Sequence, residues 1–439
     1  MAGYDPLMFQ SFEGIDRDKF MLALFSMKAR TSDALDLAQA LVIEQTTGTW
    51  TAVPEETREV KERSMGRVLG VYEMPDWERE IPAEAAAGER NLIILAAFPV
   101  ININGQFPEM LTVLYGNISM IGKLKLLDVF LPPSLLGAFK GPKFGVEGVR
   151  KLLGVGERPV LCAMYKPCVG ALPEALGKMA YELALGGIDV IKDDELLADP
   201  DFCRMDARIE VSEKAIERAR KETGRKVLYT VNVTDRPDVM FEKARKAVKL
   251  GASALMVNVY SVGYGAMQAI AEDPAITVPV LGHPSFAGTF FESPEYGLTS
   301  NLVLGKFARL SGVDMIIYPS PYGKVPLMRE RAIRVAQELT GPMGHLKRVF
   351  PGPAAGMHPG TVAISMRDFG RDLIIGAGGG IHGHPGGAVA GGKAFHQAIE
   401  AAMKGEPAAE AARKHPELKA ALDKWGDASE GKAIYSLLR

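Results

Sequence analysis

The sequence predicts an α/β protein in which an N-terminal α+β domain of ferredoxin-like type precedes a C-terminal (β/α)8 TIM barrel. From about residue 158 onward, short runs rich in Val, Ile and Leu alternate with longer amphipathic stretches rich in Ala, Lys, Glu and Arg. The preceding residues show no such alternation, and the connecting segment FLPPSLLGAFKGPKFGVEG is rich in Pro and Gly. We therefore place the domains at residues 1–140 and 141–439.

The predicted barrel strands are eight short apolar runs. They occupy residues 158–167, 188–195, 226–233, 254–260, 278–285, 315–323, 348–356 and 372–380. Helical patterns lie between them, and those at 207–224, 236–252 and 300–312 end at or near Gly, a common helix stop. A doubly wound open sheet would show the same alternation. Eight units within about 250 residues are typical of a closed barrel.

The N-terminal part has no repeat. MLALFSMKA (21–29), NLIILAAFPV (91–100) and EMLTVLYGNI (109–118) predict strands, and SDALDLAQALVIEQ (32–45) predicts a helix. The tail at 405–426 is Ala-rich and charged, which favours helices packed outside the barrel without a chemical role.

Composition excludes several classes of protein. The 51 basic and 53 acidic side chains nearly cancel and no long basic run occurs, so we expect no nucleic-acid partner. No apolar run reaches the ~18 residues of a membrane span, and the N-terminus lacks a signal-peptide pattern, so we expect no membrane association. Three cysteines without a Cys-x-x-Cys pair favour the reducing cytoplasm over a disulfide framework or a thiolate zinc site.

The residues with chemical potential gather where the predicted strands end, and barrel active sites lie at the C-terminal ends of the strands. They are Lys166 after the first run, KDDE (192–195) after the second, Asn232 after the third, His283 after the fifth, Lys324 after the sixth, Gly356 and His358 after the seventh, and glycines at 376–380 after the eighth. A purely structural barrel would not concentrate them there.

The segment KDDE predicts a metal site. Because side chains alternate along a strand, Lys192 and Asp194 share a face, and Glu195 at the strand end can turn inward. Two carboxylates with a third oxygen donor suit Mg²⁺. Lys192 could be a salt-bridge partner of these carboxylates, or it could carry a carbamate that supplies the third oxygen. KDDE alone more often marks surface charge, but its place after GGIDVI at a strand end favours the metal site.

The glycine run GAGGGIHGHPGG (376–387) predicts a phosphate site, because exposed backbone N–H groups before a helix bind phosphate. Barrels commonly bind phosphate after strands seven and eight, and Gly356 fits the same site. GGGIHG also matches a dinucleotide fingerprint, but it lies in the last unit of the chain rather than at the start of a Rossmann pair. The alternative is a glycine-rich turn without a ligand.

Several single residues keep two interpretations. Lys166 could have a lowered pKa in the barrel mouth and act as a base or electrostatic stabiliser, or it could form a salt bridge to Asp194 or Glu195. His283 and His358 are site residues or hydrogen-bonded core histidines. We interpret Cys168 as an incidental thiol, because no base is paired with it in the sequence.

These motifs together resemble the Rubisco large-subunit superfamily. The motifs are YKPCVG (165–170), GGIDVIKDDE (186–195), GHPSFAG (282–288), PSPYGK (319–324) and GAGGGIHGHPGG (376–387), with EQTTGTW (44–50) and YGN (115–117) in the N-terminal part. The resemblance covers nearly the whole chain, and the pattern GGxDxxKDDE is highly specific to this superfamily.

The resemblance implies roles for particular residues. The implied catalytic set is the enolisation lysine Lys166, the carbamylated Lys192, the histidine His283 and the mobile-loop lysine Lys324. Asp194 and Glu195 would bind Mg²⁺ together with a CO₂-derived carbamate on Lys192. The implied substrate-binding and phosphate-binding set is Thr49, Trp50, Gly356, Gly378 and Gly379, with His358 beside them, and Glu44 and Asn117 reaching into the partner subunit's site. The family's smallest working unit is a head-to-tail homodimer, so we expect a homodimer or a multiple of dimers.

Four departures from the family pattern point to its non-carboxylating branch, the Rubisco-like proteins. Cys168 stands where a second lysine is expected, Pro284 where an arginine is expected, Ile317 where a histidine is expected and Ala354 where a serine is expected. The missing arginine and histidine would bind the second phosphate of a bisphosphate. We therefore expect Mg²⁺-dependent enolisation of a small phosphorylated keto-sugar or keto-acid, without carboxylation of ribulose bisphosphate.

The reaction itself stays open. The candidates are a methylthio-ketose-phosphate enolase or isomerase of sulfur salvage and a 3-oxo-isoapionate-4-phosphate transcarboxylase/hydrolase, toward which retention of Glu44, Trp50 and Lys324 tilts the prediction. A genuine ribulose-1,5-bisphosphate carboxylase is disfavoured by Cys168, Pro284 and Ile317. A non-catalytic binding or regulatory protein on the same fold is disfavoured because the lysines and carboxylates of the barrel mouth survive together.

Overall fold

The computed structural model describes residues 7–31, 33–49, 51, 53–79, 81–83 and 87–428. The chain forms two compact units. The first comprises Met1–Lys140 together with Ala287–Val303, and the second comprises Gly141–Phe286 together with Leu304–Arg439. The segment 287–303, which the sequence places between two barrel strands, therefore packs with the N-terminal unit.

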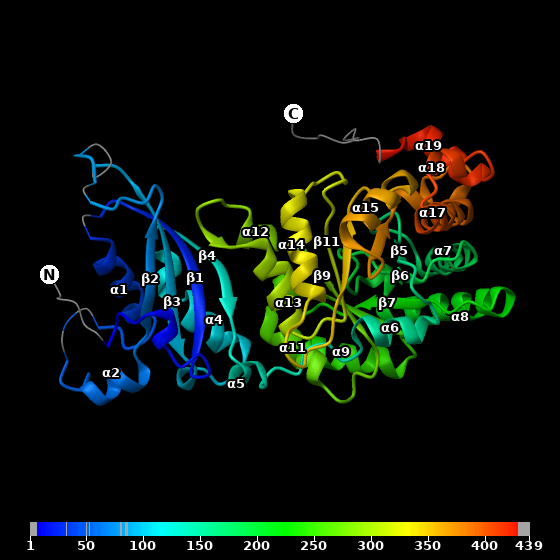
Figure 1. The fold of residues 1–439 in the computed structure, drawn as a ribbon. Coiled ribbons are helices and arrows are strands. Elements are labelled where there is room, and N and C mark those ends of the chain that lie inside the picture. Colours follow the sequence, from blue (N-terminus) through cyan, green and yellow to red (C-terminus); the bar gives the residue numbers. More distant parts are fainter. Residues whose placement is uncertain are drawn as a thin grey trace. The chain divides into compact units, whose positions relative to one another are not determined.

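The first unit is built on a five-stranded sheet with the order β10-β4-β1-β3-β2 (Figure 1). Its central strand β1 (Phe20–Ala29) pairs antiparallel with β3 (Arg90–Pro99) and with β4 (Lys123–Phe130). At the edges, β2 (Arg67–Glu73) pairs antiparallel with β3, and the short β10 (Gly297–Leu298) pairs parallel with β4. The α+β prediction for this unit is confirmed.

The predicted helix at 32–45 is present as α1 (Ala34–Glu44), and it packs against β2 and β3 (Figure 1). It begins where the Asp33 carboxylate accepts hydrogen bonds from the N–H groups of Leu35 and Asp36, which satisfies two donors of the first turn. Its buried residues Ala38, Leu41 and Val42 follow the helical repeat. The remaining helices of this unit are α2 (Arg58–Ser64), α4 (Phe107–Tyr115), α5 (Pro133–Leu136) and α12 (Gly288–Phe291).

The predicted strand at 109–118 is wrong, because most of this segment forms the helix α4. Pro108 lies in its first turn, where a missing N–H costs nothing. Phe107, Met110 and Leu114 are buried at spacings of three and four residues, a helical period that the continuous apolar run concealed. The prediction also missed β2 and β4, although the alternation KLKL at the start of β4 is typical of a strand.

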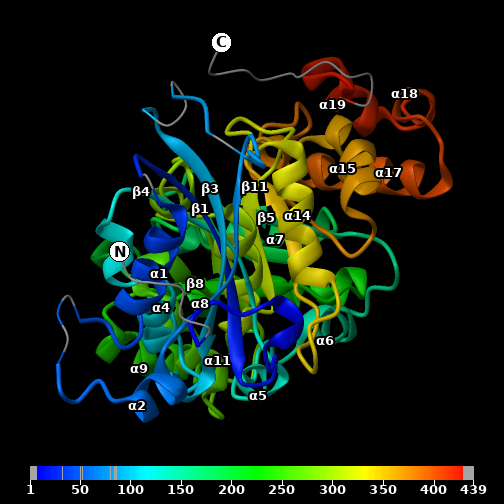
Figure 2. The ribbon, with the colours of Figure 1, turned by 60° about the vertical axis from the view of Figure 1, so that its left-hand side comes forward.

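The second unit is an eight-stranded parallel barrel, which confirms the predicted fold class (Figures 1 and 2). Its strands are β5 (Val160–Met164), β6 (Val190–Lys192), β7 (Leu228–Asn232), β8 (Ala254–Asn258), β9 (Val280–His283), β11 (Met315–Pro319), β12 (Phe350–Ala354) and β13 (Ile374–Ala377). The hydrogen-bonded order is β12-β11-β9-β8-β7-β6-β5-β13, and the outermost strands β12 and β13 also lie in contact. Each strand falls within one of the eight apolar runs.

A single apolar cluster fills the barrel. Side chains from all eight strands are buried in it, and α6 (Gly145–Leu153) contributes Val146, Val149 and Leu153 to the same cluster. Cys162 is part of this core, and burial raises the pKa of its thiol to about 12. Cys162 therefore stays an inert apolar residue.

The helices that follow the strands surround the barrel (Figure 2). They are α7 (Pro173–Leu185), α8 (Met205–Thr223), α9 (Pro237–Lys249), α10 (Val259–Val262), α11 (Tyr264–Glu272), α13 (Phe307–Leu310), α14 (Arg329–Thr340), α15 (Val362–Phe369), α16 (Gly379–His382) and α17 (Gly387–Lys404). Helix α8 ends at Gly224 in the left-handed conformation, as predicted. The predicted helix at 300–312 begins as a π-helix over Asn301–Lys306 before it continues as α13.

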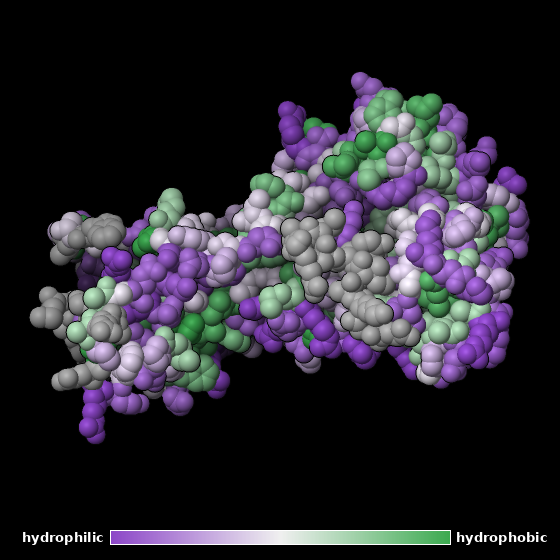
Figure 3. All heavy atoms as spheres, turned by 90° about the horizontal axis from the view of Figure 1, so that it is seen from above, coloured by the Kyte–Doolittle hydropathy of each residue, from purple (hydrophilic) through white to green (hydrophobic). Residues whose placement is uncertain are grey.

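The C-terminal tail forms α18 (Ala408–Ala411) and α19 (Pro416–Trp425), which pack on α17 as the sequence predicts (Figure 1). Hydrophilic and hydrophobic residues are interspersed on the face of the protein shown in Figure 3. Within the described part of the chain, no helix combines the length and the apolarity needed to cross a bilayer.

Candidate active site

The lysines and carboxylates predicted for the site meet at the C-terminal end of the barrel. The Nζ of Lys166, two residues beyond the end of β5, lies 2.8 Å from Oδ2 of Asp194. The Lys192 Nζ, at the last residue of β6, lies 3.3 Å from Oε2 of Glu195. Two ammonium groups thus face two carboxylates, and their charges balance. The salt-bridge alternative for both lysines describes the geometry of the chain without a bound metal.

Lys166 is half-buried and donates to two acceptors. Besides Asp194, its ammonium lies 2.8 Å from the Cys168 thiol. Burial acts to lower the pKa of Lys166, but the hydrogen bonds to Asp194 and Cys168 outweigh it and raise the pKa above its ordinary value. The lowered pKa that the sequence suggested is therefore not found in this state. Cys168 contacts Lys166 directly. Its interpretation as an incidental thiol did not predict this contact.

Lys192 is fully buried at the end of β6, in register with Met164 of β5 and Thr230 of β7. Its ammonium also donates to the Asp193 carbonyl at 2.7 Å. Although burial acts to raise the pKa of Glu195, the Lys192 ammonium outweighs it and holds that pKa below the usual value. Glu195 is therefore ionised near neutral pH.

His283 is a neutral histidine with a defined tautomer. Burial and the nearby Lys192 charge hold its pKa well below the ordinary value. The Ser285 N–H donates to Nδ1 at 3.2 Å, so Nδ1 is the acceptor of the ring. Nε2 then carries the proton and lies 3.3 Å from Oε2 of Glu195. His283 and Lys192 therefore both contact Oε2 of Glu195 and orient its carboxylate.

Two asparagines hold the backbone beside these carboxylates. Asn232 donates to the carbonyls of Asp194 and Glu195 at 3.3 Å and 3.2 Å, and Asn258 donates to the Glu195 carbonyl at 3.0 Å. Sequence reasoning named Asn232 only as a strand end and missed Asn258. The available signal was a polar residue inside the apolar run 254–260. Asn258 is the last residue of β8 and lies in register with His283.

A fully buried ion pair between Arg208 and Asp193 supports the KDDE segment (192–195). The Arg208 guanidinium, on α8, lies 3.0 Å from Oδ2 of Asp193, and the Tyr229 hydroxyl donates to Oδ1 of Asp193 at 2.6 Å. Arg208 also donates to the carbonyls of Ala198 and Cys203, at 2.7 Å and 2.6 Å. The first carboxylate of KDDE, Asp193, is therefore bound to Arg208 and Tyr229, and Arg208 also fastens the loop that follows Glu195. The sequence pattern did not reveal Arg208.

The loops after β12 and β13 lie close to the two mouth lysines. A Cβ added to Gly378 would lie 3.0 Å from Cε of Lys166, and a Cβ added to Gly356 would lie 2.8 Å from the backbone nitrogen of Lys324. Gly356 has a φ of +109°, which also favours glycine. The structure thus brings the predicted phosphate residues Gly356 and Gly378 beside the predicted catalytic lysines. Gly379 follows Gly378 as the first residue of α16.

His358 differs from the other predicted site residues. Its side chain is buried, its ring stacks on Trp425 at 6.1 Å, and neither ring nitrogen has a hydrogen-bond partner within the described residues. Burial lowers the pKa of His358 to about 4, so the ring is neutral near pH 7. A buried neutral ring provides no positive charge for a phosphate.

Two of the four residues that depart from the family pattern line the barrel interior. Ile317 and Ala354 are buried in the apolar cluster that fills the barrel. A Cβ added to Gly376 would lie 2.9 Å from Cβ of Ala354 and 3.5 Å from Cδ1 of Ile317, so these residues pack directly beneath the end of β13. Where the family pattern has polar groups, this chain has apolar packing.

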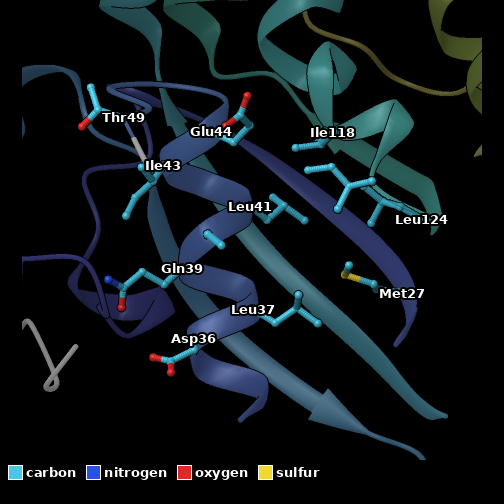
Figure 4. A pocket seen from close by; sticks show the side chains of 12 residues that line it. Met27, Asp36, Leu37, Gln39, Leu41, Ile43, Glu44, Thr49, Ile118 and Leu124 are labelled. Carbon is cyan, nitrogen blue, oxygen red and sulfur yellow. The ribbon is translucent and has the colours of Figure 1, made fainter. Parts of the chain in front are cut away.

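In the first unit, the Asn117 amide donates to Oε1 of Glu44 at 3.0 Å. Glu44 and Thr49 line a cavity of about 470 Å³ between α1 and the sheet (Figure 4). In it, Leu37 and Leu41 of α1 point toward Leu124 and Met27 (Figure 4). The cavity is mostly apolar, with Glu44 at one end. Trp50, predicted for the phosphate site, lies outside the described residues.

Within the described part of the chain, no group of three or more His, Cys, Asp and Glu side chains is arranged to hold a metal ion. The mouth offers two carboxylates of this kind, Asp194 and Glu195, with Lys192 beside them. A third anionic donor would have to come from a chemical change at Lys192.

Comparison with known families assigns both units. The catalytic domain of the ribulose bisphosphate carboxylase large chain matches residues 145–425, and the N-terminal domain of that chain matches residues 10–135. The chain belongs to the Rubisco large-chain family. The resemblance drawn from the motifs is confirmed, and it extends over both units.

Proteins of the Rubisco-like branch are among those similar to this chain. A ribulose bisphosphate carboxylase-like protein of Archaeoglobus fulgidus is 46% identical over 395 residues, 90% of each chain. A 2,3-diketo-5-methylthiopentyl-1-phosphate enolase of Bacillus licheniformis is 41% identical over 406 residues, 92% of this chain and 98% of that one. The crystal structure of a Rubisco-like protein (MtnW) from Alicyclobacillus acidocaldarius superposes with a TM-score of 0.86 at 39% identity, covering 93% of this chain and 100% of that one.

Proposed function

We propose that this Rubisco-like protein is a Mg²⁺-dependent enolase that acts on a phosphorylated diketone of the 2,3-diketo-5-methylthiopentyl-1-phosphate type. The observation that carries the proposal is the cluster of Lys166, Lys192, Asp194 and Glu195 at the barrel mouth. The enolase relatives at about 40% identity support this reaction over the transcarboxylase toward which Glu44, Trp50 and Lys324 tilt the sequence prediction.

The donor set fits Mg²⁺ once Lys192 is a carbamate. With Lys192 as an ammonium, two positive and two negative side chains cancel and no cation is attracted. A carbamate would replace one positive charge by a negative one, leaving a net charge of −2 that a divalent cation neutralises. Asp194, Glu195 and the carbamate would then be its ligands. Asn258 Oδ1, buried without a hydrogen-bond partner among the described residues, leaves one further acceptor open at this site.

When bound, Mg²⁺ would polarise the substrate carbonyl and stabilise negative charge on the enolate oxygen. The Lys192 carbamate would take the α-proton, or Lys166 would take it after losing the proton that its contacts with Asp194 and Cys168 favour. His283 holds Glu195 in place as a neutral donor. The glycines after β12 and β13 bind one phosphate beside Lys166 and Lys324. This phosphate contact orients the reacting carbon without taking part in the reaction.

The apolar departures support a substrate with one phosphate and an uncharged far end. Ile317 and Ala354 are buried in apolar packing, so neither offers a counter-charge to a second phosphate. A dianion placed there would be desolvated without a partner, which is strongly unfavourable. This argument disfavours ribulose bisphosphate, which carries a second phosphate. It favours a substrate whose far end is an uncharged thioether.

The test is proton exchange in D₂O followed by NMR. The protein is incubated with Mg²⁺, bicarbonate and 2,3-diketo-5-methylthiopentyl 1-phosphate, and in parallel with 3-oxo-isoapionate 4-phosphate. We expect loss of the C1 proton signal and enol formation from the diketone, abolished in Lys166→Ala and retained in Lys178→Ala. Lys178 is the matched control because its side chain is 78% exposed on α7. Phosphoglycerate release from the apionate with no reaction of the diketone would replace this proposal by the transcarboxylase.

A further inference from the structure

The loop that carries Lys324 is fastened at both ends to one carboxylate. It runs from the end of β11 to the start of α14, residues 320–328. On one side of Lys324, the Tyr322 hydroxyl donates to Oδ2 of Asp368. At the far end of the loop, Arg329 donates to Oδ2 at 2.7 Å and to Oδ1 at 2.6 Å of the same Asp368. A single side chain therefore connects the residues that flank Lys324.

Asp368 is well placed for this role. It belongs to the last turn of α15, which lies against α14 (Figure 1). Its carboxylate is only 1% exposed, although Arg329 and Arg367, which face it, are largely exposed. Burial acts to raise the pKa of Asp368, but the hydrogen bonds from Arg329, Tyr322 and Arg367 lower it to about 2. The carboxylate therefore stays ionised, and its bonds persist, throughout the neutral range.

A second set of contacts joins the same loop to the predicted phosphate site. The Lys324 N–H donates to the Ala355 carbonyl at 2.7 Å, and the Ser320 N–H donates to the Ala354 carbonyl at 2.9 Å. A Cβ on Gly323 would lie 2.0 Å from the Ala355 oxygen, so the two loops are in close backbone contact. The position of Lys324 relative to Gly356 therefore depends on how firmly residues 320–328 are held.

We propose that Asp368 is a positioning residue that sets the place of Lys324 by clamping both ends of its loop. The inference rests on the proposed function only for the role of Lys324 in turnover. The contacts by which Asp368 holds the loop can be measured without substrate. Asp368 lies outside the motifs that identified the family, whereas Tyr322 belongs to one of them, PSPYGK (319–324). The contact between Tyr322 and Asp368 is not part of that pattern.

The variant Asp368→Asn tests the clamp, because it keeps the size of the side chain and removes its charge. Asp372→Asn is the matched control. Asp372 is also a carboxylate between two arginines, Arg150 at 2.8 Å and Arg348 at 2.6 Å, but it precedes β13 at the opposite end of the barrel. Tyr322→Phe removes a single hydroxyl and serves as a milder variant if Asp368→Asn folds poorly.

Hydrogen–deuterium exchange is measured by mass spectrometry on peptides that cover residues 320–328. Because hydrogen bonds to a charged group are the stronger ones, we expect the amides of Tyr322, Gly323 and Lys324 to exchange about tenfold faster in Asp368→Asn. Tyr322→Phe should shift them in the same direction by less, and Asp372→Asn should not shift them. Equal exchange in Asp368→Asn and Asp372→Asn would overturn the clamp, whatever the activity.

Turnover then tests whether the clamp acts through Lys324. In a double-mutant cycle, we expect Lys324→Ala to lower kcat much less in the Asp368→Asn background than in the wild type. Equal losses in both backgrounds would overturn the positioning role. If the loop exchanges faster in Asp368→Asn but the protein enolises neither substrate, the clamp is supported and the proposed function is contradicted.

Discussion

At the scale of single residues, the chemistry of the mouth depends on which charges neighbour each lysine. Lys166 stays protonated because Asp194 and Cys168 both accept from it at 2.8 Å. Cys168 stands where the family pattern has a second lysine, and a thiol there accepts a hydrogen bond that an ammonium could not. A lysine at position 168 would lower the pKa of Lys166 by charge repulsion, whereas Cys168 raises that pKa as a hydrogen-bond acceptor.

A buried charge whose partner is removed gives the first stability prediction. Arg208→Met would leave the Asp193 carboxylate, which is 0% exposed, without its ionic partner. We expect the free energy of unfolding to fall by about 3–5 kcal/mol, as for other broken buried pairs. Arg204→Met, four residues earlier and 54% exposed, should change it by less than about 1 kcal/mol. Urea denaturation of both variants measures the difference, and similar losses would contradict the buried-pair argument.

At the scale of elements, the end of α19 supports the phosphate loops from outside. Trp425 stacks on His358 after β12, and the Lys424 ammonium donates to the Gly383 carbonyl after β13 at 2.6 Å. A Cβ on Gly360 would lie 2.0 Å from the Gly426 oxygen, so backbone meets backbone there. The tail was predicted to pack outside the barrel, and its last turn reaches the loops that flank Gly356 and Gly378.

This packing makes stability depend on pH through His358. Its pKa is about 4 in the folded protein against an ordinary value of 6.5, so the unfolded chain binds a proton over this range and the folded one does not. Stability therefore falls as the pH falls from about 6.5 to 4. Compared with His358→Phe, the wild type should lose about 3 kcal/mol more between pH 7 and pH 4. Urea titrations at several pH values measure this.

The exposed His345 provides the control for that series. His345→Phe removes an exposed ring in place of the buried one and is measured in the same urea titrations. A His358→Phe variant with the same pH dependence as His345→Phe would show that the buried ring does not govern acid stability.

At the scale of the whole molecule, the family resemblance implies a homodimer in which Glu44 and Asn117 of one protomer complete the barrel site of its partner. In the first unit these residues are hydrogen-bonded to each other beside an apolar cavity (Figure 4). A shared site of this kind makes a clear prediction for mixed dimers, since each protomer contributes a different part of each site.

Glu44→Gln and Lys192→Met should each be inactive alone, and a dimer that contains one protomer of each should regain one complete site. In a random mixture of co-expressed chains, about a quarter of the wild-type activity should return, because half the dimers are mixed and half their sites are intact. Differently tagged chains allow the mixed dimers to be purified. A mixture as inactive as its components would place the whole site within one protomer.

The sequence by itself determined what depends on local pattern. The repeating apolar runs predicted eight strands, because each strand buries its own short segment in the barrel core. The strand ends predicted Lys166, Asp194, Glu195 and His283, because the topology of a barrel brings all such ends to one face. The helix α4 was misread because an apolar run does not show its period clearly.

Only the tertiary structure decided which groups touch. The pairs Lys166–Cys168, Arg208–Asp193 and Tyr322–Asp368 join residues on different loops or elements, or depend on how a loop turns. Burial, which sets the pKa of His283 and His358, depends likewise on packing by distant segments such as α19. Local pattern places a residue at the mouth of the barrel, whereas its charge state and its partners are properties of the folded chain.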